Sequence, residues 1–542
     1  MRFPRSSGPR VVGLSMAALL LLGGPVAPIH AADPAPLSLA FSSDITGLDP
    51  AITYDMNTFA THHLLYDTLL AYDEDLRLYP SLAAAMPEVS DDGLTFTFTL
   101  RDTPFVGKGG EPIRPVTAKD VVFSLNRVLR PDLKPNPSPV GPAFFSVIKG
   151  AQDVLDGKAE VASGLEVVDD HTVRITLDHP DRTFLNTLAM QFGMILPEEI
   201  AGLDGANLLA NPVGSGPYWL ESYLPGQKLT FRRNPHYWRE GYPKSDAAEI
   251  RLLVSDADQV LQVEAGELDL TGDPLSAGDF TAVSSDPTYA DRLSLTPINS
   301  TSYLTLDNGP DSPFHDVRVR QAVAHAIDRD ARVALQNGRA VAATCIFPPE
   351  LPGYDPECQG YTHDLDAARA LMAEAGMADG FTTTLYTDTT QLSATVAQAA
   401  VADLAQIGIT VDVVPQEFAT LMTTATTPHA APMMMVGWFQ DYPDPSDFID
   451  PILSCATTVA GAFNVSQFCD PSIDERAAAL RREIDLDAAI PGYQAIQRDL
   501  MEQVPLVPLD YQVWSVLRSD RVPEFSVHGT YFYDLPSIEV AG

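Results

Sequence analysis

The segment GSGPYWLESYLPGQKLTFRRNPHYWRE, residues 214–240, decides the fold because it joins a glycine turn, two alternating runs and an aromatic-rich exit. The alternating runs flank Pro225-Gly226, a dipeptide suited to a tight turn, so the segment is predicted to form a β-hairpin. Gly214 and Gly216 permit a positive φ before the first run, and Asn234-Pro235 ends the second. By itself, this pattern indicates a hairpin and no function.

Helix and strand patterns alternate along the rest of the chain. Thr117 and Asp120 form a capping-box pattern ahead of a helix whose apolar residues recur at helical spacing. Helical periodicity predicts further helices from Asp316 and over residues 364–376. Period-two alternation and short apolar runs predict strands at 94–100, 166–168, 172–177, 382–386, 410–414 and 433–438. This mixture favours an α/β class in which helices cover mixed sheets.

The N-terminus has the layout of a secretory signal peptide, residues 1–32. Three arginines precede an apolar run, and a small-residue stretch follows it, so we expect cleavage near Ala31 or Ala32. The alternative, a membrane anchor, is disfavoured because about 12 apolar residues cannot span a bilayer core of roughly 30 Å. No cysteine follows the run, so a lipid anchor is not expected. The mature protein is therefore predicted to be soluble and periplasmic.

The chain is strongly acidic, with 34 Lys and Arg against 72 Asp and Glu and a formal charge of −38. Removal of residues 1–32, which contain three arginines and no acidic residue, leaves 31 basic against 72 acidic residues and a charge of −41. This balance disfavours nucleic acid as a partner, because phosphate backbones attract basic proteins. We interpret the acidic surface as a solubility feature, with attraction of cationic ligands as the alternative. The remaining length of about 510 residues predicts two to four domains.

Four cysteines, Cys345, Cys358, Cys455 and Cys469, all lie in the part of the chain expected to be exported. Neighbouring cysteines are 13 and 14 residues apart, and local pairing is the simplest of three connectivities. In an oxidising compartment each such disulfide could stabilise the fold by roughly 3 kcal/mol. A zinc site is the competing interpretation, but the chain has no CxxC and no histidine close to the second pair. We therefore expect disulfides and no bound metal.

Several segments resemble family 5 bacterial solute-binding proteins, the extracytoplasmic receptors that feed peptide-type ABC transporters. The hairpin is similar to the GTGPY...RNPxYW segment of that family, and the resemblance covers nearly the whole mature chain. The other similar segments are GLDPA (47–51), LLYDTLL (64–70), YPSLAAAMPEVSDDGLTFTFTLR (79–101), VTAKDVVFSLNRV (116–128), FHDVRVRQAVAHAIDR (314–329), GWFQDYPDPSDF (437–448) and VPLVPL (504–509). Their number, order and spacing indicate an architecture and a transport role rather than one ligand.

The resemblance implies a two-lobed α/β fold like that of class C periplasmic binding proteins, with an extra subdomain in the first lobe and a ligand cleft between the lobes. Lobe I is expected to comprise residues 33–73, 207–296 and 513–542, the extra subdomain residues 74–206, and lobe II residues 297–512. The chain is expected to cross between the lobes near 296–304 and 508–514.

The resemblance also places the ligand site in GWFQDYPDPSDF, which follows a buried strand and carries an aromatic residue and several carboxylates. In peptide-binding relatives an aspartate of this segment pairs with the α-ammonium of the ligand, and the matching position is Asp441. Trp438 would supply an apolar wall beside Gly437. Tyr54 belongs to TYDMNT, which resembles a segment that approaches the ligand in relatives. The alternative interpretation is that the aspartates of the loop cap turns beside its prolines.

One departure bears on specificity. Dipeptide-binding relatives place an arginine for the ligand carboxylate in the region that here reads YTDTTQLSAT, residues 386–395, which contains no Arg, Lys or His. In contrast, SCATTVAGAFNVSQFC, residues 454–469, resembles the disulfide loop of the dipeptide binders. The missing charge makes longer peptides, or another solute that carries an amine, plausible ligands.

The resemblance therefore implies a monomeric receptor that captures a peptide, oligopeptide or dipeptide, and delivers it to the membrane permease of an ABC transporter. Receptors for nickel chelates, oligosaccharides or opine-like compounds on the same fold are an alternative. A secreted hydrolase that uses Asp441 and Asp444 as paired carboxylates is a further alternative. The sequence contains no GxSxG, HExxH, CxxC or phosphate-loop motif, so neither an enzyme nor a cofactor is expected.

Overall fold

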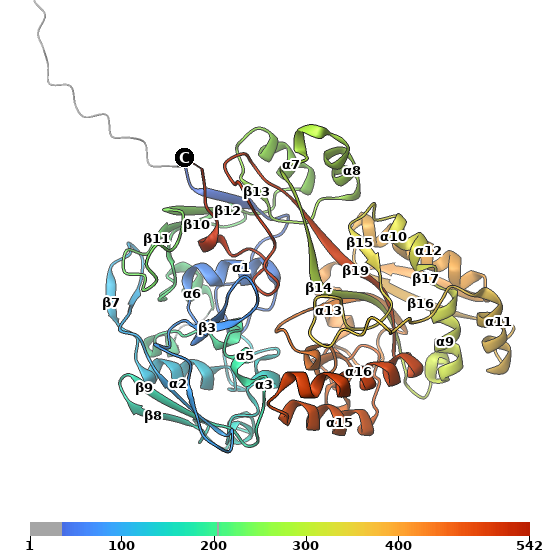
Figure 1. The fold of residues 1–542 in the computed structure, drawn as a ribbon, viewed down its shortest axis with the longest axis horizontal. Helices are drawn as coiled ribbons and strands as arrows, with labels where there is room; N and C mark the ends of the chain where they lie inside the picture. The colour runs from blue at the N-terminus through green and yellow to red at the C-terminus, as the bar shows by residue number, and fades with distance from the viewer. Residues whose placement is uncertain (1–34, 203–204, 542) are drawn as a thin grey trace, which may run out of the picture. The chain divides into compact units, whose positions relative to one another are not determined.

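A computed structural model describes residues 35–202 and 205–541, so the predicted signal peptide, residues 1–32, lies outside the described residues. A five-stranded mixed sheet contains the first strand of the described chain together with both strands of the predicted hairpin (Figure 1). Its strands, in spatial order, are β10 (Tyr218–Leu224), β11 (Lys228–Arg233), β12 (Ala247–Arg251), β1 (Leu37–Ala40) and β13 (Leu270–Thr271). β10, β11 and β12 pair antiparallel, whereas β1 pairs parallel with β12 and β13. The hairpin prediction is confirmed.

The glycines before the hairpin serve close packing rather than an unusual backbone angle. Gly226 at the hairpin turn has φ +65°, as a tight turn requires, but Gly214 and Gly216 have no positive φ. The expectation of positive φ at these two positions is therefore wrong. A Cβ at Gly214 would lie 2.0 Å from the carbonyl oxygen of Leu65, and one at Gly216 would lie 2.4 Å from the carbonyl carbon of Leu65. The end of helix α1 (Met56–Leu65) thus packs directly on the backbone of this segment.

Gly216→Ala is expected to lower the free energy of unfolding by about 2 kcal/mol, because the new methyl group overpacks a backbone contact that cannot yield. Urea denaturation followed by circular dichroism measures this loss. Gly278→Ala is the matched control, since the nearest atom to its Cβ would be 3.9 Å away. Equal stabilities for the two variants would contradict the packing argument.

A six-stranded mixed sheet forms the second half of the chain. β14 lies at its centre and pairs antiparallel with β18 and β19, whereas β16 pairs parallel with β17 and β18. The strands, in spatial order, are β15 (Ala340–Ala342), β19 (Leu506–Leu517), β14 (Leu293–Leu306), β18 (Met433–Phe439), β16 (Phe381–Thr387) and β17 (Ile409–Pro415). The strands predicted at 382–386, 410–414 and 433–438 are confirmed.

Helices cover both faces of this sheet, as alternation along its strands requires. Leu304 and Leu306 of β14 pack in one core with helices α9 (Val317–Ala326), α11 (Leu365–Glu374) and α12 (Gln391–Ala405). Tyr303 points into a separate core with helices α14 (Asp450–Leu453), α15 (Pro471–Arg482) and α16 (Leu486–Gln503). The helices predicted from Asp316 and over 364–376 correspond to α9 and α11.

A smaller α/β layer occupies the region between β1 and the hairpin. Its four-stranded antiparallel sheet has the order β4 (Glu88–Val89), β5 (Thr95–Thr99), β9 (Thr172–Thr176), β8 (Leu165–Asp169). Helix α2 (Ala118–Arg127) packs on β8 and β9 and begins with the predicted capping box of Thr117 and Asp120. Two short hairpins flank this layer, β2 (Leu70–Tyr72) with β3 (Leu78–Pro80) and β6 (Pro104–Val106) with β7 (Pro112–Pro115).

The remaining helices are short and connect these sheets. They are α3 (Gly141–Phe145), α4 (Ala151–Leu155), α5 (Phe184–Thr187), α6 (Gly205–Ala210), α7 (Asp256–Glu264), α8 (Ala277–Ser285), α10 (Arg329–Ala334) and α13 (Phe418–Ala425). β14 and β19 pair from Leu293 with Leu517 to Thr305 with Leu506, and the residue after β19, Arg518, bridges to β13. These two long strands therefore run from the six-stranded sheet to the edge of the five-stranded sheet (Figure 1).

Candidate functional site

A cavity of about 1010 Å³ lies between the six-stranded sheet and the segments that follow β1 and β13 of the five-stranded sheet. It is bounded by the start of α1, by β14, β18 and β19, by α10 and α13, and by the loop between Cys455 and Cys469. All four residues expected to bind ligand, Tyr54, Gly437, Trp438 and Asp441, line it. The structure thus brings together residues that lie almost 400 positions apart in the sequence.

The Tyr54 hydroxyl donates to both carboxylate oxygens of Asp441, at 2.9 Å to Oδ1 and 2.7 Å to Oδ2. Tyr54 precedes α1, whose N-cap is Asp55, and Asp441 follows the end of β18. Burial, with the negative charge of Asp441 beside it, raises the pKa of Tyr54 well above its usual range. Tyr54 therefore stays a hydrogen-bond donor to Asp441 at every physiological pH.

A second carboxylate stands directly behind Asp441. The backbone N–H of Asp441 donates to Asp447 Oδ2 at 2.8 Å, and Trp438 Nε1 donates to the same oxygen at 3.4 Å. Burial raises the pKa of Asp441 to about 7, although the Tyr54 hydrogen bond works against this rise. Burial, followed by repulsion from Asp441, raises the pKa of Asp447 well above its usual range. Within residues 35–202 and 205–541 neither carboxylate forms an ion pair, so a cation bound beside Asp441 would relieve this repulsion.

Asp444 belongs to a different set of contacts from Asp441. Its carboxylate oxygen Oδ2 accepts from Arg182 at 2.9 Å (Nε) and 2.7 Å (Nη2), and both side chains are almost fully buried. Asp444 also accepts from the backbone N–H of Ser446, as a turn cap does. Asp444 is not among the residues that line the cavity. The two carboxylates suggested for a hydrolase therefore do not face a common space.

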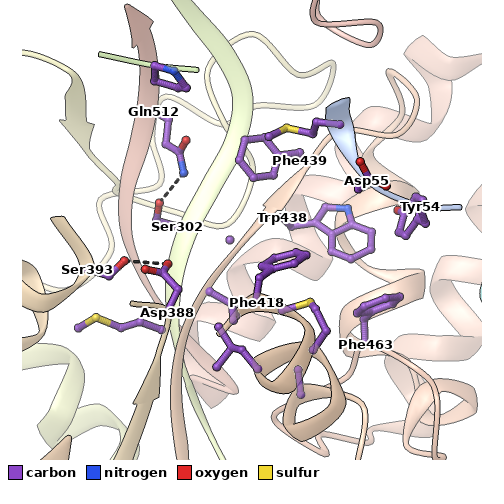
Figure 2. A pocket seen from close by; sticks show the side chains of 18 of the residues that line it. Tyr54, Asp55, Ser302, Asp388, Ser393, Phe418, Trp438, Phe439, Phe463 and Gln512 are labelled. Carbon is purple, nitrogen blue, oxygen red and sulfur yellow. Dashed lines mark hydrogen bonds between the residues drawn. The ribbon is translucent and has the colours of Figure 1, made fainter. Parts of the chain in front are cut away.

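Aromatic side chains form the cavity wall next to Tyr54 (Figure 2). The ring of Phe463 lies 5.9 Å from that of Trp438 and 6.1 Å from that of Tyr54, centroid to centroid. Phe418 of α13 is 63% exposed although it is large and apolar, and it lines the cavity. Such an apolar surface with a few polar groups is typical of a small-molecule site.

Gly437 adds no side chain to the cavity wall, and a Cβ at this position would not cause a steric clash. A Cβ there would lie 3.4 Å from the carbonyl oxygen of Thr301, which is an ordinary contact distance. Gly437 has no positive φ, so neither its angle nor a close backbone approach requires glycine. Its contribution to the site is the absence of a side chain on the cavity side of β18.

Sequence reasoning missed several residues of the cavity. Arg332 of α10 forms a buried ion pair with Asp510 of β19, and Arg339 donates to the carbonyl oxygens of Gln336 and Leu275. Gln512, also on β19, donates to Ser302 of the neighbouring strand β14 at 3.1 Å (Figure 2). No local motif marks these residues, because their chemistry arises only when α10 packs beside β19.

Both pairs of neighbouring cysteines form disulfides, Cys345 with Cys358 and Cys455 with Cys469. The second disulfide closes the loop that carries Phe463 and Val465 to the cavity wall. Asn464 fastens the same loop from inside, since its side-chain amide donates to the carbonyl oxygens of Ser454 and Phe468. The zinc interpretation of the cysteines is therefore excluded in this structure.

The profile of a family described as bacterial extracellular solute-binding proteins, family 5 Middle, matches residues 77–459. Di/tripeptide-binding protein 2 of Pseudomonas aeruginosa (strain UCBPP-PA14) is 31% identical over 91% of this chain and 92% of its own length. Within residues 35–202 and 205–541, no helix is both long and apolar enough to cross a membrane.

Solved structures share the arrangement of the sheets. Clavulanic acid biosynthesis oligopeptide binding protein 2 is 26% identical, with a TM-score of 0.83 over 94% of this chain and 96% of that protein. The ABC transporter-associated periplasmic binding protein DppA from Helicobacter pylori, solved with the peptide STSA, is 24% identical, with a TM-score of 0.81 over 94% of this chain and 98% of that one. The predicted two-lobed α/β fold is confirmed by these likenesses.

Proposed function

Because the chain belongs to the bacterial extracellular solute-binding proteins of family 5, we propose that it is a receptor that captures a peptide and delivers it to an ABC transporter. The observation that carries this proposal is the placement of the Tyr54–Asp441 pair in the wall of a cavity of about 1010 Å³. A cavity of this size accommodates a short peptide. The name of the relative that is 31% identical, a di/tripeptide-binding protein, supports the same class of ligand.

In this proposal Asp441 accepts hydrogen bonds from the α-ammonium of the peptide, and Trp438 and Phe463 contact its apolar parts. An ammonium at Asp441 supplies the positive charge that the two neighbouring carboxylates lack, and each charge-assisted hydrogen bond is worth about 1.5 to 3 kcal/mol. Main-chain hydrogen bonds to the peptide backbone then allow its side chains to vary. In this proposal the site binds its ligand and catalyses no reaction.

We assign the five-stranded sheet to lobe I, residues 33–73, 207–296 and 513–542, the layer around β5 and α2 to an extra subdomain, residues 74–206, and the six-stranded sheet to lobe II, residues 297–512. The chain crosses between these lobes within β14 and β19, near 296–304 and 508–514. Bending of these two strands closes the cleft around a ligand and forms the surface that the permease recognises. The receptor acts as a monomer in the periplasm after loss of residues 1–32.

Two alternatives differ in ligand chemistry rather than in fold. A receptor for a nickel chelate, an oligosaccharide or an opine-like compound would use the same cavity without an ammonium at Asp441. A hydrolase would need two carboxylates that reach one substrate, whereas Asp444 is engaged by Arg182 outside the cavity wall. Peptide capture accounts for the Tyr54–Asp441 pair better than either.

Native mass spectrometry of the protein, purified from its periplasm without unfolding, tests the proposal. A retained ligand adds its mass to the folded protein, and collisional release identifies it by fragmentation. Peptide masses support the proposal and give the length range. Retention of a sugar, a metal chelate or another compound without peptide bonds would discard peptide specificity and keep the family assignment.

Peptide binding is expected to weaken as the pH falls below about 7. The pKa of Asp441 in the ligand-free protein is about 7, and only its ionised form attracts an ammonium. Each pH unit below that value therefore raises the Kd of a free-amine peptide by up to about tenfold, and the Kd rises again above about pH 8, where the α-amine of the peptide loses its proton. Calorimetric titrations from pH 5 to 8.5 with a peptide recovered from the protein measure this slope. The N-acetylated form of the peptide is the control, and equal slopes for both forms would contradict the role of Asp441.

A further inference from the structure

Asp388 places a carboxylate on the side of the cavity away from Tyr54. Asp388 follows the end of β16 and lines the cavity together with Ser393 at the start of α12. In Figure 2 the labelled rings of Trp438 and Phe418 lie between Asp388 on one side and Tyr54 on the other. The cavity thus has an acidic group on each side of an apolar middle.

Asp388 is fixed in place by its own segment. Its Oδ1 accepts from the backbone N–H of Thr390 at 2.8 Å, and its Oδ2 accepts from the hydroxyl of Ser393 at 2.8 Å. Both donors are neutral, and Asp388 is only half-buried. Within the part of the chain that the structure describes, Asp388 forms no ion pair with an arginine, lysine or histidine. Its charge is therefore held at the cavity wall without being neutralised.

The two arginines of the cavity wall do not balance this charge. Arg332 is paired with Asp510, whereas Arg339 donates to the carbonyl oxygens of Gln336 and Leu275 and keeps its positive charge. Asp44, Asp55, Asp388 and Asp441 outnumber this one arginine, so the net charge around the cavity is negative. A field of this sign raises the local concentration of cationic solutes and repels anionic ones.

We infer that the receptor prefers peptides with a second positive charge. A lysine or arginine side chain carries this charge and binds Asp388, while the α-ammonium of the same peptide binds Asp441. This inference rests on the proposed function and names the class of peptide within it. The apolar middle holds the methylene groups of such a side chain, since Lys and Arg bury their stems on apolar surface and keep the charged end beside a polar group. Neutral and acidic peptides leave Asp388 without a positively charged partner.

Calorimetry with defined tripeptides tests the preference. The probes are alanine tripeptides in which lysine, norleucine or glutamate replaces each position in turn, because norleucine matches the lysine stem without its charge. We expect the best lysine peptide to bind about tenfold more tightly than its norleucine match, and the glutamate peptide to bind more weakly than both. Acetylation of the lysine side chain should abolish the advantage in the unmodified protein.

Two variants test whether Asp388 causes the preference for lysine peptides. Asp388→Asn keeps an acceptor for the Thr390 N–H and should reduce the lysine-to-norleucine ratio to about one. Asp412→Asn removes the same charge from an exposed position of β17 outside the cavity and should keep the ratio. Equal affinity for lysine and norleucine peptides, a preference for glutamate, or loss of the ratio in Asp412→Asn would each overturn the inference and leave peptide capture standing. Failure of every probe to bind would overturn the proposed function and this inference with it.

Discussion

Asp441→Asn is expected to weaken the binding of a free-amine peptide about 100-fold. Asparagine keeps the shape of the side chain and still accepts from the Tyr54 hydroxyl, but it lacks the charge that attracts an ammonium. A loss of about 2.8 kcal/mol corresponds to 100-fold in Kd and lies within the worth of charge-assisted hydrogen bonds. Isothermal calorimetry with a peptide recovered from the protein measures the change.

The chemical counterpart of this variant is acetylation of the peptide amine. The N-acetylated peptide should bind the unmodified protein about as weakly as the free-amine peptide binds Asp441→Asn, and the variant should not distinguish the two forms. Asp412→Asn, on the exposed side of β17, is the control for a general change of charge. Equal affinity of the unmodified protein for both peptide forms would remove Asp441 from the site.

Arg182→Met is expected to lower the free energy of unfolding by about 3 to 5 kcal/mol, the second large effect. Arg182 joins the loop after β9 to the loop after β18 through Asp444, and to the C-terminal end of α15 through the carbonyl oxygens of Leu480 and Glu483. Its removal leaves the buried carboxylate of Asp444 without a counter-charge, which costs more than the pair itself contributes. Urea denaturation followed by tryptophan fluorescence measures the loss.

Two controls separate burial from charge. Arg77→Met removes an arginine whose side chain is 71% exposed beside Asp73 and Asp75, so its effect should stay within about 1 kcal/mol. The double variant Arg182→Met with Asp444→Asn removes both buried charges, keeps the acceptor for the Ser446 N–H and should recover part of the lost stability. If the double variant were no more stable than Arg182→Met alone, the uncompensated charge would not be the cause.

Local patterns predicted the elements of the fold well. The hairpin around Gly226, the capping box at Thr117 and the strands on both sides of the helices in the second half all follow from periodicity within about ten residues. The prediction of a positive φ at Gly216 was wrong. The sequence alone does not distinguish a glycine that permits close backbone packing from one that permits a positive φ angle. Only the neighbouring chain, at Leu65, distinguishes the two cases.

The candidate site was predictable only in part. Tyr54, Gly437, Trp438 and Asp441 all line the cavity, and they were chosen through resemblance rather than through residue chemistry. The partner of Asp444 could not be predicted, because Arg182 lies 262 positions away and carries no local signal. Asp447 was interpreted as a turn cap, whereas the structure places it behind Asp441, accepting from its backbone N–H. Contacts across such distances depend on packing, which periodicity does not encode.

The Tyr54–Asp441 hydrogen bonds hold the carboxylate in position without neutralising it, because the donor is an uncharged phenol. Each carboxylate oxygen has two lone pairs, so a ligand can bind Asp441 while Tyr54 stays in place. A neutral donor adds one more neutral hydrogen bond, whereas a cation adds a charge-assisted one of roughly twice the strength. In the proposed receptor this pair therefore selects solutes by charge before size or side chain is tested.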